Sequence, residues 1–448
     1  MKSKAPGFRT VLSNRNFFFL WIGQAISLLG DKFNQMALIA LVTLRAPGSL
    51  KEMTRLILFL NLPILFVGPW AGVYVDRWNR KKTMIVSDIL RGLGDLTIPL
   101  VAIPLVVLLS SLNESTKLPL FISLLPIYFM ILLVYTIASF YQPAQLALIP
   151  HLVERKGFLT ANAALRAAAM VAIIIGAKMG DWVIAQMGIN SGFYIDAGTF
   201  FFSALCISLI VLPRLVKRRE KPKKAKFYPL VKKISQELIE GLKMVKDNRI
   251  VFYAVASMAI LMAGTGAIFA LIILFIKEHF EASLMGGFFG FLGKGALGTI
   301  YALLGAGMVL GAILTGKFGQ KIAKEKIIMG SLISAGVVLL LIVGILPFQE
   351  SLSKEAFFSF FALASLLLGG AVIPIWIASD TLLHEVLPDE FRGRVFGARR
   401  TIYILTFLIC NYLVGRFAQT EDLGMVLGLA VVIGGVLAFW NYRVFRRA

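Results

Sequence analysis

The stretch Gly72-Val-Tyr-Val-Asp76-Arg77-Trp-Asn-Arg80-Lys81-Lys82 separates two long apolar segments. The segment before it runs from Arg55 to Val75, and the other follows it directly. A run of about 20 apolar residues is long enough to cross a bilayer as a helix. A densely charged stretch between two such runs therefore predicts a short loop that joins two membrane-spanning helices.

The composition excludes an ordinary soluble protein. Of the 448 residues, 58% are hydrophobic and only 16% are charged, whereas about a quarter of the residues of a soluble domain are charged. The net charge of +22 does not indicate a nucleic-acid partner, because the basic residues lie in short clusters between apolar segments. Such clusters are typical of membrane topology signals and of contacts with lipid headgroups.

The sequence contains no set of residues that predicts a cofactor, a metal site or an enzyme centre. Cys206 and Cys410 lie in separate apolar segments, and His151, His279 and His384 are far apart in the chain. A metal or catalytic centre needs several such side chains at one place. We therefore expect no metal, no cofactor and no enzymatic activity.

Twelve membrane-spanning helices are predicted, in two sets of six. The expected ranges are 16–44, 55–75, 83–109, 119–142, 160–187 and 193–213, and then 250–277, 296–316, 326–347, 356–379, 396–417 and 424–441. Residues 1–213 would form an N-terminal six-helix bundle and residues 250–448 a C-terminal one. Residues 214–249 would form a basic cytoplasmic linker that contains an amphipathic helix.

The linker and the loops predict the topology. From Val231 to Val245 apolar residues recur at intervals of three and four, with lysines between them. This pattern favours an amphipathic helix on the cytoplasmic face of the membrane, and a solvated connector is the alternative. Lysine and arginine are concentrated in alternate loops, which places both termini in the cytoplasm of a multi-pass inner-membrane protein.

The charged stretch resembles the loop between the second and third helices of the major facilitator superfamily, a large group of secondary transporters. The shared order is Gly72, three residues, Asp76-Arg77, two residues and Arg80-Lys81. An ordinary positive-inside stop signal is the alternative interpretation. The resemblance implies an all-α fold of two pseudo-symmetric six-helix bundles, with the substrate site between them. A fainter version, Gly311-Ala-Ile-Leu-Thr-Gly316-Lys317, occupies the equivalent place in the second half.

Several further blocks resemble the macrolide-efflux-type branch of drug exporters, which also includes siderophore exporters and lysophospholipid transporters. They are Phe19-Leu-Trp-Ile-Gly-Gln24-Ala-Ile-Ser-Leu-Leu-Gly30-Asp31, Tyr141-Gln-Pro143-Ala, Ala161-Asn162-Ala163, Glu240-Gly241 with Asn248, and Pro388-Asp-Glu-Phe-Arg392-Gly393-Arg394-Val-Phe396-Gly397. The sequence departs from the drug antiporters in two places. Its fifth predicted helix has no proline at Gly176-Ala177-Lys178-Met179-Gly180-Asp181, and its fourth has no arginine.

One polar stripe follows the first predicted helix, at Gln24, Ser27, Asp31, Asn34 and Gln35. Charged residues in a membrane segment cost about 2.5–3.5 kcal/mol to insert, and they usually face a cavity or a partner. Asp31 is therefore a candidate to bind a cationic substrate or a proton. A structural salt bridge with another helix is the alternative. Lys32 is either a partner for a carboxylate of another helix or a second substrate ligand.

Other charged residues are spaced for pairing within one helix. Arg91 lies three residues after Asp88 and four before Asp95, and Lys178 lies three before Asp181. These spacings place the side chains on one helix face, which favours structural ion pairs. Charges at helix ends are candidates for a cytoplasmic gate that holds one access state, as the resemblance implies. The gate candidates are Gly72, Asp76, Arg77, Arg80, Lys81, Asp380 and Arg394, with Asp380 expected near Arg392 and Arg394 in the next loop.

The resemblance and the intramembrane charges together predict a secondary transporter that works by alternating access. We expect export of an amphipathic or drug-like small molecule, coupled to protons, by a monomer surrounded by membrane lipids. The alternative is a lysophospholipid transporter or flippase, or a siderophore exporter, of the same fold.

Overall fold

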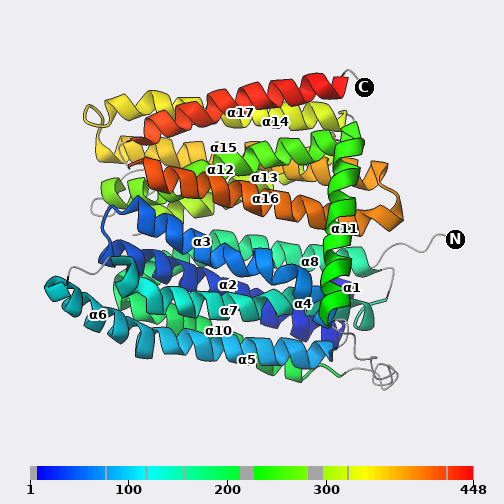
Figure 1. The fold of residues 1–448 in the computed structure, drawn as a ribbon, viewed down its shortest axis with the longest axis horizontal. Coiled ribbons are helices and arrows are strands. Elements are labelled where there is room, and N and C mark those ends of the chain that lie inside the picture. Colours follow the sequence, from blue (N-terminus) through cyan, green and yellow to red (C-terminus); the bar gives the residue numbers. More distant parts are fainter. Residues whose placement is uncertain are drawn as a thin grey trace. The chain divides into compact units, whose positions relative to one another are not determined.

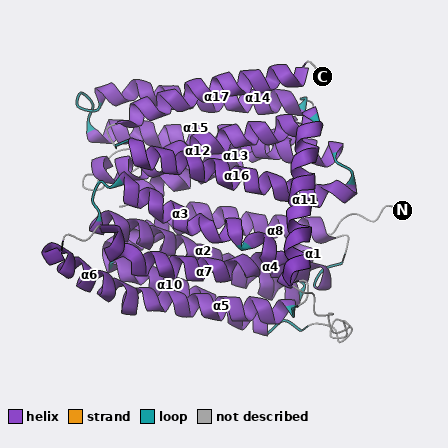
Figure 2. Cartoon of the chain, in the orientation of Figure 1, coloured by secondary structure: helices purple, strands orange, loops and turns teal. Residues whose placement is uncertain are grey.

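The computed structural model describes residues 8–75, 78–116, 120–154, 157–211, 227–280, 296–319, 322–419 and 422–446. Within these ranges every regular element is a helix (Figures 1 and 2). Asp76 and Arg77 lie outside the described residues, as does the part of the linker at 214–226. The all-α fold class predicted from the sequence is confirmed.

The helices divide between two compact units, which are described separately. The first unit comprises residues 1–46 and 59–226, and the second comprises residues 47–58 and 227–448. Elements of the first unit are α1 (Phe8–Leu12), α2 (Arg15–Arg45), α4 (Gly68–Val75), α5 (Arg80–Thr97), η1 (Ile98–Ala102), α6 (Ile103–Thr116), α7 (Leu120–Leu148), η2 (Ile149–His151), α8 (Phe158–Val171), η4 (Ala172–Gly176), α9 (Ala177–Met187) and α10 (Ile189–Ser208). Elements of the second are α11 (Phe227–Asp247), α12 (Arg249–Phe280), α13 (Ala296–Phe318), α14 (Lys324–Ile345), η8 (Leu346–Phe348), α15 (Lys354–Val386), α16 (Asp389–Phe417) and α17 (Leu423–Arg446). Helix α3 (Leu50–Phe66) has residues in both units.

Among the described residues, nine helical segments are long and apolar enough to cross a membrane. The remaining three predicted spans coincide with α3 and α4, with α10 and with α16. The structure is thus consistent with twelve spans. Outside these spans, helix α11 lies at the place where the sequence predicts an amphipathic helix.

The second predicted span is broken into α3 and α4 at Val67. The amide of Val67 still donates to the carbonyl of Pro63 at 2.8 Å. Pro69 has no backbone N–H with which to continue the ladder. The break therefore follows from proline.

Two wide helical turns, η1 and η4, interrupt the third and fifth spans. In η1 the amide of Ile103 bonds to the carbonyl of Ile98, five residues earlier. Pro99 within this turn has no N–H to give to the carbonyl four residues before it, so an ordinary helical ladder loses a bond at this point. The wide turn lets the chain continue as a helix beyond the proline.

In the first unit, α10 packs against both α2 and α5, and α5 packs against α7. The approach of α2 to α10 depends on Gly30, because a Cβ at this position would overlap the Thr199 hydroxyl and lie 2.5 Å from Asp196 Oδ1. Small residues allow such close helix contacts in membranes, where no hydrophobic effect drives helices together. The tight contact brings polar groups of α10 against α2.

In the second unit, α13 packs against α15, and α12 packs against α16. A Cβ at Gly307 would overlap the carbonyl oxygen of Leu366 and lie 3.1 Å from the amide nitrogen of Gly370. Helix α11 crosses the ends of α12 and α16, as Figure 1 shows. There a Cβ at Gly241 would overlap the carbonyl of Arg394, so α11 sits directly on the backbone of α16.

Candidate functional site

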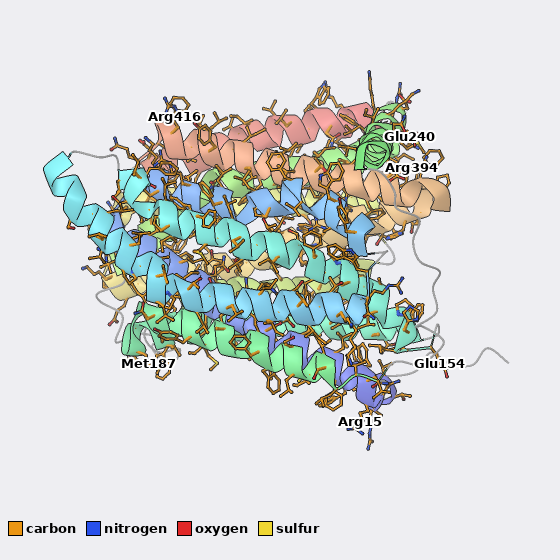
Figure 3. The ribbon with its side chains drawn as sticks, turned by 60° about the horizontal axis from the view of Figure 1, so that its bottom comes forward. Arg15, Glu154, Met187, Glu240, Arg394 and Arg416 are labelled. Atoms are coloured by element: carbon orange, nitrogen blue, oxygen red, sulfur yellow. The ribbon has the colours of Figure 1, made fainter. Side chains whose placement is uncertain are left out.

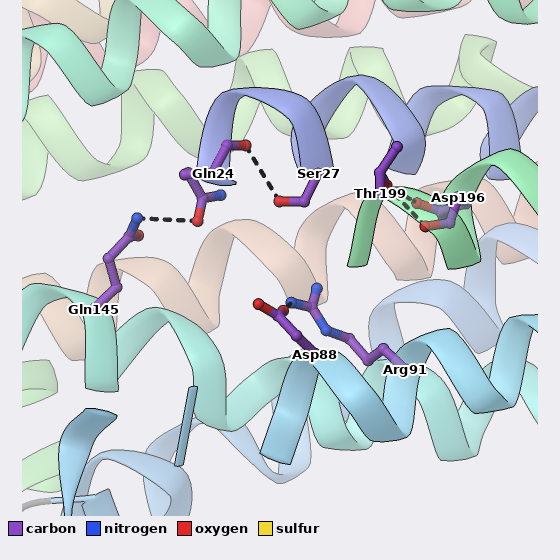
Figure 4. A network of polar contacts seen from close by, with 7 residues as sticks. All are labelled: Gln24, Ser27, Asp88, Arg91, Gln145, Asp196 and Thr199. Carbon is purple, nitrogen blue, oxygen red and sulfur yellow. Dashed lines mark hydrogen bonds and ion pairs between the residues drawn. The ribbon is translucent and has the colours of Figure 1, made fainter. Parts of the chain in front are cut away.

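The polar stripe of α2 faces the other helices of the first unit along most of its length. Ser27 and Asn34 are buried, and Gln24, Asp31 and Gln35 are partly exposed. Gln145 of α7 donates from Nε2 to Gln24 Oε1 at 3.0 Å, and Ser27 bonds back to the Gln24 carbonyl at 3.2 Å (Figure 4). The stripe therefore joins α2 to α7 through a hydrogen bond between the side chains of Gln24 and Gln145.

Asn34 connects the stripe to α5. Its Nδ2 donates to Asp95 Oδ1 at 2.8 Å, between two buried side chains. The sequence grouped Arg91 with both Asp88 and Asp95, and the direct ionic contact of Arg91 is with Asp88, three residues before it (Figure 4). Asp95 is bonded instead to Asn34 of α2. Residue spacing along α5 does not predict a contact with another helix.

Arg91 is held on three sides. Besides the ion pair with Asp88, its guanidinium lies over the ring of Phe200 at 4.0 Å and over the ring of Tyr141 at 4.7 Å. Arginine is suited to this position, because its planar head pairs with a carboxylate and stacks on aromatic faces at once. The arrangement fixes one positive charge in the interior of the first unit.

Asp196 of α10 is a further buried acid, which the sequence reasoning missed. Its side chain is 1% exposed, and the Thr199 hydroxyl donates to its backbone carbonyl at 2.7 Å and to its Oδ1 at 3.3 Å (Figure 4). A usable signal was present in the sequence, since Asp196 is the only charged residue between Ile189 and Ser208.

These groups form one electrostatic cluster inside the first unit. Among the described residues it contains four carboxyl groups and two bases, which are Asp31, Asp88, Asp95, Asp196, Lys32 and Arg91. Asp31 interacts with both Arg91 and Lys32. If every group were charged, the cluster would carry two uncompensated negative charges away from bulk water. An excess of this kind favours the binding of a proton or of a cationic ligand.

The two lysines among the predicted intramembrane residues, Lys32 and Lys178, each interact with a group on their own helix. Lys32 donates from Nζ to Gln35 Oε1 at 3.0 Å, one turn along α2. Lys178 is partly exposed and Asp181 is buried in α9, and the two charges interact with each other. These contacts keep both lysines close to an acceptor or an acid of their own helix.

Two of the predicted gate residues contact the ends of neighbouring helices. Arg80 donates to the carbonyl of Ala147 at 3.0 Å and contacts His151, where α7 ends. Lys81 donates to the carbonyls of Ser208 and Ile210, each at 2.7 Å, where α10 ends. Positive groups at helix C-termini are favourable, because the last carbonyls lack partners and the helix dipole is negative there. The backbone of Gly72 is helical, within α4.

In the second unit the structure corrects the predicted surroundings of Asp380. Residues 392 and 394 are part of helix α16 rather than of a loop. Asp380 pairs with Arg399, which lies about one and a half turns beyond Arg394 in α16. Arg394 itself pairs with Glu240 of α11 at 2.7 Å (Figure 3). The early start of α16 turns Arg394 toward α11, and the 11%-exposed Arg399 takes its place beside Asp380.

Comparison with known proteins decides the family. The family model described as Major Facilitator Superfamily matches residues 20–403. The chain belongs to the Major Facilitator Superfamily. This facilitator is therefore a multi-pass membrane transporter rather than an enzyme, as the sequence predicted.

Curated relatives of this facilitator include exporters. It is 25% identical over 408 residues to macrolide efflux protein A of Streptococcus pyogenes, covering 90% of this chain and 89% of that protein. It is 26% identical to an uncharacterised MFS-type transporter of Bacillus subtilis (strain 168), covering 97% of this chain and 89% of that protein. The putative bacilysin exporter of the same strain is 24% identical and covers 93% of this chain and 91% of that protein.

Solved structures share the fold of this facilitator. A bacterial homologue of iron transporter ferroportin, in the inward-facing state, has a TM-score of 0.71 at 14% identity, covering 96% of this chain and 98% of that one. The nucleoside transporter NupG has a TM-score of 0.68 at 14% identity, covering 96% of this chain and 99% of that one. At such identities the likeness concerns the fold alone.

Proposed function

We propose that this facilitator exports an amphipathic or drug-like small molecule and that protons moving inward drive the export. The observation that carries the proposal is the excess of buried acids over bases in the first unit. Four carboxyl groups share two cations there, and such a cluster gains stability by taking up a proton. The names of the macrolide and bacilysin relatives support export as the direction.

Asp31 is the proposed recognition or coupling carboxylate. Asp31 is partly rather than fully buried, and it interacts with Arg91 and Lys32. Gln24 and Gln35 offer hydrogen bonds on the same helix, one of them already used by Lys32. A carboxylate of this kind binds a cation when ionised and releases it when a proton arrives, which links the two fluxes.

The proposed setting is a monomer in the cell inner membrane, with both termini in the cytoplasm. Alternating access would be controlled by ion pairs at helix ends, among them Arg394–Glu240 and Asp380–Arg399. These pairs join α16 to α11 and to α15, so a movement of α16 would have to break or exchange them.

The test is efflux of two probes, labelled erythromycin and ethidium, from proteoliposomes and from cells that express the protein. We expect an uncoupler to stop efflux by the wild type. Asp31→Asn should lower efflux about tenfold or more, because a hydrogen bond to a charged group contributes roughly 1.5–3 kcal/mol. Asp247→Asn, at an exposed position near the end of α11, is the control and should keep wild-type efflux.

Two results would contradict the proposal. Efflux that continues at the wild-type rate after the uncoupler is added would contradict proton coupling. If neither probe moves while a fluorescent lysophospholipid crosses the bilayer in the absence of a gradient, the lipid-transporter alternative replaces the export proposal.

A further inference from the structure

Two carboxyl groups from different helices meet inside the first unit. Asp95 of α5 and Asp196 of α10 lie within hydrogen-bonding reach of each other, and they are 0% and 1% exposed. Two ionised carboxylates at this separation repel each other strongly when water is excluded. A carboxylic acid beside a carboxylate instead forms a short, charge-assisted hydrogen bond.

The buried oxygens around this pair lack a donor. Asp95 Oδ1 accepts from Asn34 Nδ2, but Asp95 Oδ2 has no hydrogen-bond partner, and neither does Asn34 Oδ1. Buried polar atoms are normally satisfied, and each one that is not requires an explanation. One added proton would supply a donor at this place, whereas no described group donates a hydrogen bond to either of these two oxygens.

The surrounding charges leave the pair without a cation of its own. From α2 the negative charge of Asp31 acts on the pair, and from α5 the positive charge of Arg91 does. Arg91 is already in contact with Asp88. From α7 the phenol of Tyr135 faces the same charges, and it is neutral in its ordinary form.

The lysines on α9 and α2 do not neutralise the negative charge of the pair. On α9, Lys178 interacts with Asp181 of its own helix. On α2, Lys32 interacts with Asp31 and donates to Gln35. Among the described residues, the only base that acts on the pair is Arg91, which already forms an ion pair with Asp88.

We infer that Asp95 and Asp196 share one proton and form the proton-binding site of this transporter, with Asn34 as the positioning residue. The inference rests on the proposed function and deepens it, because it separates proton binding from substrate recognition at Asp31. Uptake of one proton lowers the excess of negative charge in the cluster from two to one, and its release restores the excess. The proton bridges α5 and α10, so its arrival and departure change the contact between two helices that also pack on α2 and α7.

Infrared difference spectroscopy on the purified full-length protein tests the inference without a substrate. We expect the wild type to show, at neutral pH, the carbonyl stretch of a protonated carboxyl group, with the shift to lower frequency that deuterium exchange produces. Asp95→Asn and Asp196→Asn should each shift this band, because the remaining acid no longer shares its proton with a second carboxylate. Asn34→Ala should keep the band but move it, since one hydrogen bond to Asp95 is lost.

Two controls make the assignment specific. Asp31→Asn and Asp247→Asn should both retain the wild-type band, and thermal melting establishes that each variant is folded. Absence of the band from the wild type, or its survival at unchanged frequency and intensity in a folded Asp95→Asn or Asp196→Asn protein, would overturn the inference. If one of these variants fails to fold, the other variant and the band shift in Asn34→Ala still test whether the two acids share a proton.

The same variants distinguish this inference from the proposed function. If the uncoupler leaves wild-type efflux unchanged while the band depends on the pair, the pair holds a proton but the export proposal fails. If efflux is driven by protons while the band is unaffected by both substitutions, the export proposal stands and the proton site lies elsewhere.

Discussion

Replacing Arg91 by methionine is expected to lower the free energy of unfolding by about 3–5 kcal/mol, because the change leaves a buried carboxylate without its cation. Asp88 is 0% exposed and its direct ionic contact is Arg91. Methionine keeps much of the length of the side chain and can still pack between Tyr141 and Phe200, so the loss is mainly electrostatic. Thermal melting of the detergent-solubilised protein measures it as a fall of several degrees.

The double variant Asp88→Asn with Arg91→Met provides the matched control. Removing both members of a buried pair costs far less than removing one, so the double variant should melt above the single one. Arg91→Lys should fall in between, because it keeps the charge but not the planar stacking on the two rings. A single variant that melts at the wild-type temperature would show that the pair does not stabilise the first unit.

The second large effect is expected at Gly307 of α13. Alanine at this position should destabilise the second unit by about 3 kcal/mol, since overpacking usually costs 1–3 kcal/mol and the obstructing atoms are backbone atoms of α15. The added Cβ would overlap the Leu366 carbonyl and lie 3.1 Å from the Gly370 amide nitrogen. Neither atom can move without shifting a whole helix.

Gly316 provides the control in the same helix. A Cβ there has no heavy atom within 4 Å, so Gly316→Ala should leave the melting temperature unchanged or raise it slightly, because alanine is the better helix former. Both variants are compared with the wild type by melting and by the fraction that remains monodisperse after heating. Equal melting temperatures for the two alanine variants would refute the role assigned to the contact between α13 and α15.

The sequence predicted the class of fold because its evidence is local. Long apolar runs and charged loops are properties of consecutive residues, and the bilayer imposes the same length on every span. The break at Val67 and the early start of α16 at Asp389 were missed. The positions of the break and of the helix start depend on the hydrogen bonds of individual turns, and hydropathy does not predict these bonds.

The site was predicted only in part, for a related reason. Helical spacing placed Asp31 and Asn34 on one stripe of α2, and it placed Asp88 beside Arg91. It could not reveal that Asp95 and Asp196 meet, since they belong to α5 and α10, a hundred residues apart. That meeting depends on how closely the helices pack, and the close packing of α2 on α10 requires Gly30. A glycine on a polar stripe gives no hint of the residue that will face it.

The wide turn η1 has a consequence for how relatives of this chain can vary in length. It accommodates one residue more than an ordinary turn, so deleting one residue between Ile98 and Ala102 would close it. Closure would restore an ordinary helical turn and leave α5, with its buried acids, in nearly the same orientation relative to α6, because the wide turn already absorbs the extra residue. A homologue with a one-residue gap at this point can therefore keep its acids in place, whereas the same gap elsewhere in the span would rotate them by about 100°.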